Sequence, residues 1–228
     1  MLHGYGSSLL EGTLLTLALA LSSLVIAALL GLAGALAKLS RSRLLQALAE
    51  AYTTFIRAVP DLVVMLLVFY GGQVAINQLG ERLGWDYIDI NPFLAGALTI
   101  GFVFGAYLTE TLRGAFLAVP PGQREAAVAF GMRPGQVLWR VVGPQMLRHA
   151  LPGLSNNWLV MIKSTAIVSV IGLSDLLGRA KDAAGTTREP FLFYLAAGVV
   201  YLLLTSVSEL GFAWLTRRLA IGTRKVTL

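Results

Sequence analysis

Several charged and polar side chains of this sequence lie within, or at the ends of, long apolar stretches. Asp61 precedes the run "LVVMLLVFYGG", Glu110 lies near the end of another apolar run, and Lys163 stands beside Ser164 within a third. An ionisable group in an apolar span is costly, so it usually faces a pathway, a cavity or an opposite charge. We therefore take these residues, with Asn157, as candidates for a polar path through the protein.

The two acids each have a structural alternative. Pro60 frees backbone groups beside Asp61, and broken helix starts of this kind often line cavities, although Asp61 can also be a helix cap at an interface. Glu110 stands three residues before Arg113, so a local ion pair on one helix face explains it as well as contact with a positively charged ligand does.

The remaining candidates also stay open between two roles. Lys163 can neutralise Asp61 or Glu110 in an ion pair, or it can bind a carboxylate of a ligand. Asn157 can hydrogen-bond between helices or line the path. Glu209, in the last apolar run, is interpreted as structural.

Other kinds of chemistry find no support in the residues. The sequence has no cysteine, which excludes disulfides and thiolate metal sites. His3 and His149 are isolated, so no metal site is predicted, and no Ser, His and Asp stand in a recognisable catalytic order. The sequence contains no G-x-x-x-x-G-K-[ST] loop to hold nucleotide phosphates.

The composition is that of an integral membrane protein. Of the 228 residues, 56% are hydrophobic and only 13% charged, and the mean hydropathy is +0.72. The net charge of +6 comes from basic residues scattered at the ends of apolar runs, without a dense basic tract, so no nucleic-acid partner is predicted. The bilayer is the expected surrounding.

Five apolar runs are about long enough to cross a bilayer. We predict an all-α fold whose five membrane spans are Leu14–Ala37, Tyr52–Ile76, Phe93–Thr109, Leu151–Leu173 and Phe191–Leu215. Most basic residues fall on one side of these spans, including the terminal Arg224 and Lys225. Because basic loops stay cytoplasmic, the N-terminus is predicted outside and the C-terminus inside. We expect one membrane domain, 1–228, with a cytoplasmic loop at about 113–147.

The loop contains a patterned segment, "EAAVAFGMRPGQVLWRVVGPQ", at 125–145. A short helix is expected to end at Gly131, and a second to run until Pro144 stops it. The segment resembles the loop motif of ABC importer permeases. The residues that match the motif are Glu125, Ala126, Ala127, Gly131, Val141 and Pro144, whereas Gly143 stands where the family usually has Leu.

The resemblance extends over essentially the whole chain, through "RAVPDLVVMLLVFYG", "GAYLTETLRGAFLAVPPGQREAA" and "LPGLSNNWLVMIKSTAIVSVIG". The sequence is similar to the polar amino-acid permeases, and among them to the Q-type subunits of histidine and lysine/arginine/ornithine importers. The resemblance implies the type I importer fold in a bacterial inner membrane, and transport by alternating access. It also implies that Asp61 holds a cationic substrate side chain.

The resemblance further implies partners. An ATP-binding cassette ATPase dimer is expected to grip the 125–144 segment and to hold the ATP and Mg, so the chain itself needs no cofactor and is not an enzyme. A homologous permease or a second copy, and a periplasmic amino-acid-binding protein, complete the expected assembly. The alternative is a secondary transporter or channel, driven by an ion gradient without an ATPase.

Overall fold

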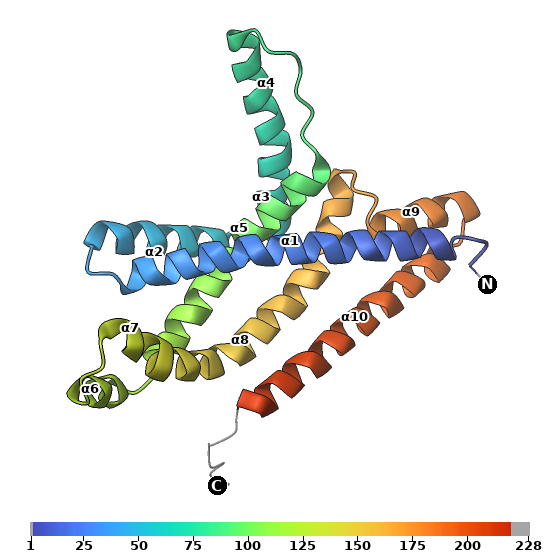
Figure 1. Ribbon diagram of the computed structural model, residues 1–228. Helices are drawn as coiled ribbons and strands as arrows, with labels where there is room; N and C mark the ends of the chain where they lie inside the picture. Colours follow the sequence, from blue (N-terminus) through green and yellow to red (C-terminus); the bar gives the residue numbers. More distant parts are fainter. Residues whose placement is uncertain (1, 220–228) are drawn as a thin grey trace.

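The computed structural model describes residues 2–219, and Arg224 and Lys225 lie outside them. The described chain is helical, without a strand (Figure 1). The helices are α1 (Gly6–Leu39), α2 (Arg43–Ala58), α3 (Asp61–Leu66), α4 (Gly72–Leu83), α5 (Pro92–Leu117), α6 (Pro121–Ala129), α7 (Pro134–Val137), α8 (Gly143–Ser164), α9 (Leu176–Thr187) and α10 (Pro190–Leu219). π-Helical turns at Leu67–Gly71 and Leu138–Val142 join α3 to α4 and α7 to α8, and the 3₁₀ helix Thr165–Ile171 follows α8.

Five segments of the described chain are long and apolar enough to span a membrane, which confirms the predicted number. Their bounds are Gly6–Leu39, Asp61–Leu83, Pro92–Leu117, Pro134–Ile171 and Pro190–Leu219. The predicted start of the second span was wrong, because Tyr52 belongs to the separate helix α2. Pro60 disfavours helical backbone in the residue before it, and Val59 is accordingly extended, with φ −98° and ψ 134°.

The predicted stop at Pro144 was also wrong. The chain stays helical from Pro134 to Ser164, and the π-helical turn Leu138–Val142 lies directly before Gly143 and Pro144. Proline lacks a backbone N–H and clashes with the preceding turn of a regular α-helix. The wider hydrogen-bonding pattern of a π-turn relieves both problems, so the helix passes through Pro144.

Helices α1 and α5 form the tightest pair of the fold. A Cβ added at Gly101 would lie 2.6 Å from the Cβ of Ile26, and one added at Gly105 would lie 2.8 Å from the Cβ of Leu30. The small residues therefore let the two backbones approach closely, as expected between membrane helices. The glycines of α5 thus serve helix packing within the subunit.

The main apolar core lies where α5 meets α1, α3 and α8. Leu19, Met65, Phe104 and Met161 are nearly or fully buried there. Helix α4 extends away from this core at a steep angle to α1 (Figure 1). The core thus fixes α5 between the broken start of α3 and the end of α8, where the polar candidates stand.

Candidate functional site

A small pocket brings together two of the residues selected from the sequence. Asp61, at the first position of α3, and Ser164, the last residue of α8, line it together with Thr99 from the middle of α5. The remaining lining is apolar and consists of Met65, Ile100, Val103, Phe104 and Ile167. Both Asp61 and Ser164 stand where a regular helix begins or ends, so the backbone breaks position the polar groups.

Thr99 is the pocket residue that sequence reasoning missed. Its side chain is 2% exposed, and its hydroxyl has no hydrogen-bond partner within residues 2–219. A threonine in an apolar helix usually satisfies its hydroxyl on its own backbone, as Thr109 does with the carbonyl of Gly105 at 2.9 Å. The sequence gives no sign that Thr99 differs from Thr109, whereas the pocket does.

Asn157 and Lys163 lie outside this pocket. The Asn157 side-chain amide donates to the Thr111 hydroxyl at 3.0 Å, which links α8 to α5. Asn157 therefore forms a hydrogen bond between helices, which is one of the two roles considered for it. Lys163 is exposed and forms no ion pair with any residue of the described chain, so the pair expected with Asp61 or Glu110 is not made.

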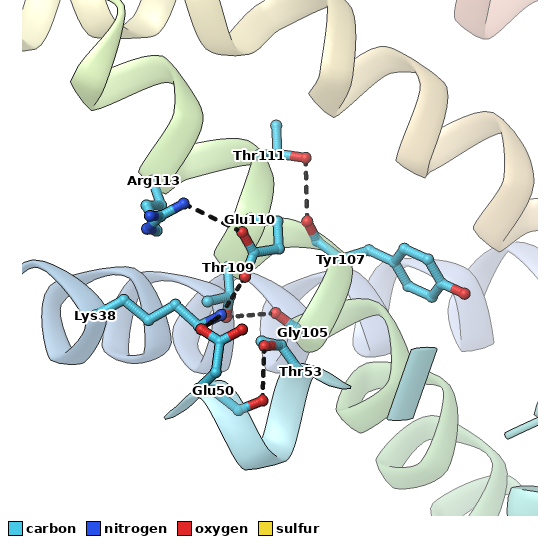
Figure 2. Close-up of polar contacts among 9 residues, drawn as sticks. All are labelled: Lys38, Glu50, Thr53, Gly105, Tyr107, Thr109, Glu110, Thr111 and Arg113. Carbon is cyan, nitrogen blue, oxygen red and sulfur yellow. Dashed lines mark hydrogen bonds and ion pairs between the residues drawn. The ribbon is translucent and has the colours of Figure 1, made fainter. Parts of the chain in front are cut away.

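Glu110 belongs to a separate ion cluster at the junction of α1, α2 and α5 (Figure 2). It pairs with Arg113 at 3.6 Å, as its spacing predicts, and also with Lys38 from the end of α1. The Lys38 side chain is only 4% exposed and also donates to Glu50 of α2 at 2.7 Å. This hydrogen bond and the Lys38 charge lower the pKa of Glu50 below its ordinary value.

The patterned loop folds as two short helices around a glycine. Gly131 has φ +77°, a left-handed conformation that only glycine adopts readily, and it separates α6 from α7. The N–H of Met132 donates to the carbonyl of Ala127 at 3.1 Å, which closes the turn. Ala127 is buried against Val137 and Val142, so the two helices share a small apolar core.

The outer surface of the loop carries the rest of the motif. Glu125 and Ala126 are exposed, and so are two large aromatic side chains, Phe130 at 86% and Trp139 at 80%. Exposed aromatic rings beside charged residues are typical of protein interfaces. The loop therefore has the geometry of a rigid, angled surface for another protein.

Comparison with known proteins assigns the family. Residues 27–221 match the family described as "Binding-protein-dependent transport system inner membrane component". The chain is 51% identical, over all 228 residues and the full length of both chains, to the histidine/lysine/arginine/ornithine transport system permease protein HisQ of Escherichia coli (strain K12). It is 43% identical to the octopine transport system permease protein OccQ of Rhizobium meliloti, over 97% of this chain and 94% of the relative.

A solved structure supports the same assignment. The crystal structure of an amino acid ABC transporter with histidines superposes with a TM-score of 0.80 at 32% identity, covering 94% of this chain and 95% of the other. These relatives are transport subunits of ABC importers, whose ATPase is a separate subunit, so neither an enzyme nor a stand-alone secondary transporter fits. The chain therefore belongs to the binding-protein-dependent inner membrane components, as the multi-pass permease subunit of an ABC importer.

Proposed function

We propose that this permease, as part of an ATP-driven importer, passes cationic amino acids across the membrane. The proposed substrates are of the histidine, arginine, lysine and ornithine class. The observation that carries the proposal is the small pocket that Asp61, Thr99 and Ser164 line together. The relatives of this chain belong to amino-acid importers. The substrates in the name of the 51%-identical permease HisQ, histidine, lysine, arginine and ornithine, support the cationic class.

The pocket chemistry suits a positively charged head group. Ammonium and guanidinium groups only donate hydrogen bonds, so they need acceptors, and a carboxylate beside two hydroxyl oxygens supplies them. A charge-assisted bond to Asp61 is stronger than a neutral one because the apolar lining excludes water. A neutral substrate of the same size lacks the charge and should gain much less from Asp61.

The energy for transport comes from outside the chain. We place the ATP and Mg on a cassette ATPase dimer that docks on the loop surface around Glu125, Phe130 and Trp139. Closure of the ATPase pair then moves α5 and α8, which lead into and out of the loop, between inward-open and outward-open states. Such a cycle requires different substrate affinity in the two states, since equal affinity shifts no population.

The remaining assembly follows the same assignment. We place the chain in a bacterial inner membrane as one domain, with its N-terminus outside and its C-terminus inside. A homologous permease or a second copy forms the other half of the pathway. A periplasmic amino-acid-binding protein delivers substrate to the outer segments around 84–91 and α9.

The substrate class is tested by Asp61→Asn in the importer reconstituted with its ATPase and binding protein. We expect uptake of arginine or lysine to fall at least about tenfold, which corresponds to one lost charge-assisted bond. The matched control is Glu81→Gln, an exposed carboxylate in the last turn of α4, which should transport normally. ATP hydrolysis stimulated by the binding protein shows whether the Asp61→Asn complex still assembles. An unchanged rate of arginine uptake would contradict the proposed role of Asp61.

A further inference from the structure

A second group of buried polar side chains lies near the N-terminal half of α1 and includes Thr165, which follows the pocket residue Ser164 in the chain. Four elements meet there: α1, the 3₁₀ helix Thr165–Ile171, the start of α9, and α10 (Figure 1). The side chains of Thr16, Thr165 and Asp175 are each 0% exposed, and the hydroxyl of Tyr201 is buried as well. Nothing in the proposed transport cycle uses these residues.

Asp175 is the residue of this group that needs an explanation. It caps α9, and one carboxyl oxygen, Oδ1, accepts a hydrogen bond from the N–H of Gly178 at 2.9 Å. The other oxygen, Oδ2, is buried and has no partner in the described part of the chain. An ionised carboxylate is expensive to bury unless an opposite charge or several donors compensate it.

The nearest cation does not compensate it. Arg179 stands one turn further along α9, but its guanidinium lies 2.7 Å from Glu11 and also donates to the Ser8 hydroxyl and the Ser174 carbonyl. The charges of Arg179 and Glu11 thus satisfy each other. The other charged residues of α9, Lys181 and Asp182, are exposed, and Glu189 pairs with His3 at 3.1 Å.

The groups that do approach Asp175 are neutral hydroxyls. The Thr16 hydroxyl accepts from the N–H of Leu176 at 3.1 Å, and that of Thr165 donates to the Ile162 carbonyl at 2.6 Å. The Tyr201 hydroxyl, from α10, is buried at the same junction and forms no hydrogen bond among the described residues. A carboxyl group surrounded in this way gains most when it carries a proton to donate.

We propose that Asp175 is a proton-binding site, whose carboxyl group is kept neutral by its buried position at the junction with Thr16, Thr165 and Tyr201 and by the lack of a paired cation. In this form the junction contains no uncompensated charge, and Oδ1 still caps α9 through Gly178. Loss of the proton leaves an anion among hydroxyls and apolar side chains. The packing of α9 against α1 and α10 then weakens.

The electrostatics of the site agree with this assignment. Burial raises the pKa of Asp175 from 3.8 to about 6, against the opposing backbone N–H groups of Gly178, Leu177 and Asp175 itself. The site therefore binds its proton roughly a hundred times more tightly than an exposed aspartate does. Because the folded-state pKa is raised, stability is highest below the unfolded value and falls as the pH rises towards the folded value. Well above about pH 6, Asp175 is ionised in the folded protein, and the loss of folding stability caused by its burial has reached its full size.

Infrared difference spectroscopy of the assembled importer in lipid nanodiscs tests the proposal directly. Between about pH 5 and about pH 8, the wild type should lose a carboxylic-acid C=O band, with a midpoint near 6. Asp175→Asn should lack that band. The matched control Asp182→Asn, on the exposed face of the same helix, should keep it. Absence of the band in the wild type, or its persistence in Asp175→Asn, overturns the proposal.

A second pair of variants covers the case in which Asp175→Asn does not assemble. Tyr201→Phe removes one hydroxyl of the junction and should shift the frequency of the band, whereas Tyr194→Phe, exposed on the same helix, should not. An unshifted band in Tyr201→Phe overturns the assignment of the protonated carboxyl group to this junction. The melting temperature of the wild type should also be higher at about pH 5 than at about pH 8. Substrate selectivity at Asp61 does not enter any of these measurements.

Discussion

The ammonium group of Lys38 lies 2.7 Å from the carboxylate of Glu50, so the end of α1 is tied to α2 across the turn between them. The same ammonium donates to Glu110 of α5, and its side chain is only 4% exposed (Figure 2). Helix α5 continues from this cluster towards α6 and the motif loop. Lys38 thus fixes the α1–α2 hairpin to the helix that leads to the motif loop.

Replacement of Lys38 by Met should destabilise the permease. Removing one partner of a buried pair typically costs about 3–5 kcal/mol, because the other charge stays buried without compensation. Glu110 is partly exposed and keeps Arg113, so we expect a smaller loss, about 1–3 kcal/mol. Thermal unfolding of the purified protein measures it, and Lys181→Met, at an exposed position, is the control. Equal melting temperatures for the two variants would show that the cluster contributes nothing.

Glu50 should matter less than Lys38. Its carboxylate is exposed, and an exposed ion pair contributes little because water and salt screen it. Since Lys38 lowers the pKa of Glu50, any contribution is present above the ordinary carboxyl pKa and disappears as the pH falls through the lowered value. Glu50→Gln should therefore unfold at nearly the wild-type temperature at neutral pH. A loss as large as that of Lys38→Met would mean that the two residues act as one unit.

The close approach of α1 and α5 predicts a position-specific effect of one methyl group. At Gly101 an added Cβ meets the Cβ and Cγ2 of Ile26, both 2.6 Å away, so Gly101→Ala should push the helices apart and cost about 1–3 kcal/mol. Gly114→Ala, in the same helix, has nothing within 4 Å and should be neutral or slightly stabilising. The free energies of unfolding of both variants, measured under identical conditions, show whether helix packing or helix propensity determines the effect of the added methyl group.

The sequence was sufficient for features that depend on local pattern. Apolar runs predicted the five spans, and the helix-breaking Gly131 was read correctly because its left-handed backbone is a local property. The continuous helix through Pro144 was not predictable, since it depends on a π-turn that no residue type marks. Span ends were also shifted, above all where Pro60 separates α2 from α3.

Sites assembled from distant segments were only partly predictable. Asp61 and Ser164 were selected separately for their polarity, and only the fold shows that they share a pocket with Thr99. The partner of Glu110 was missed because Lys38 is far away in sequence and reads as an ordinary span-flanking lysine. The ion pair expected of Lys163 is not made in the described chain, where its side chain is exposed, and its place on the path stays a prediction.

Phe130 should be needed for coupling but not for folding. Its ring is 86% exposed beside the left-handed turn at Gly131, so truncation removes no internal packing. An aromatic anchor at a protein interface typically contributes at least about 2 kcal/mol, so Phe130→Ala should weaken ATPase binding about thirtyfold or more. Co-purification with the ATPase and ATP-driven uptake measure the effect. Val207→Ala, exposed on α10, is the control, and normal coupling in Phe130→Ala would move the docking surface elsewhere on the loop.

The unpartnered hydroxyl of Thr99 gives a sharp test of the pocket. Thr99→Val keeps the shape of the side chain but removes its only polar atom, and a buried hydroxyl without a partner is itself unfavourable. The empty protein should therefore be as stable as the wild type or slightly more so, while uptake of a cationic amino acid falls several-fold through a higher KM.

Thr99→Ser should restore uptake because the hydroxyl returns to the same place. Thr109→Val supplies the contrast: it lies in the same helix, but its hydroxyl already donates to Gly105, so its loss should lower stability and leave the KM unchanged. Combining Thr99→Val with Asp61→Asn should cost less than the two separate effects added together, because both groups bind one head group. Strict additivity in that double-mutant cycle would place the two residues on different parts of the path.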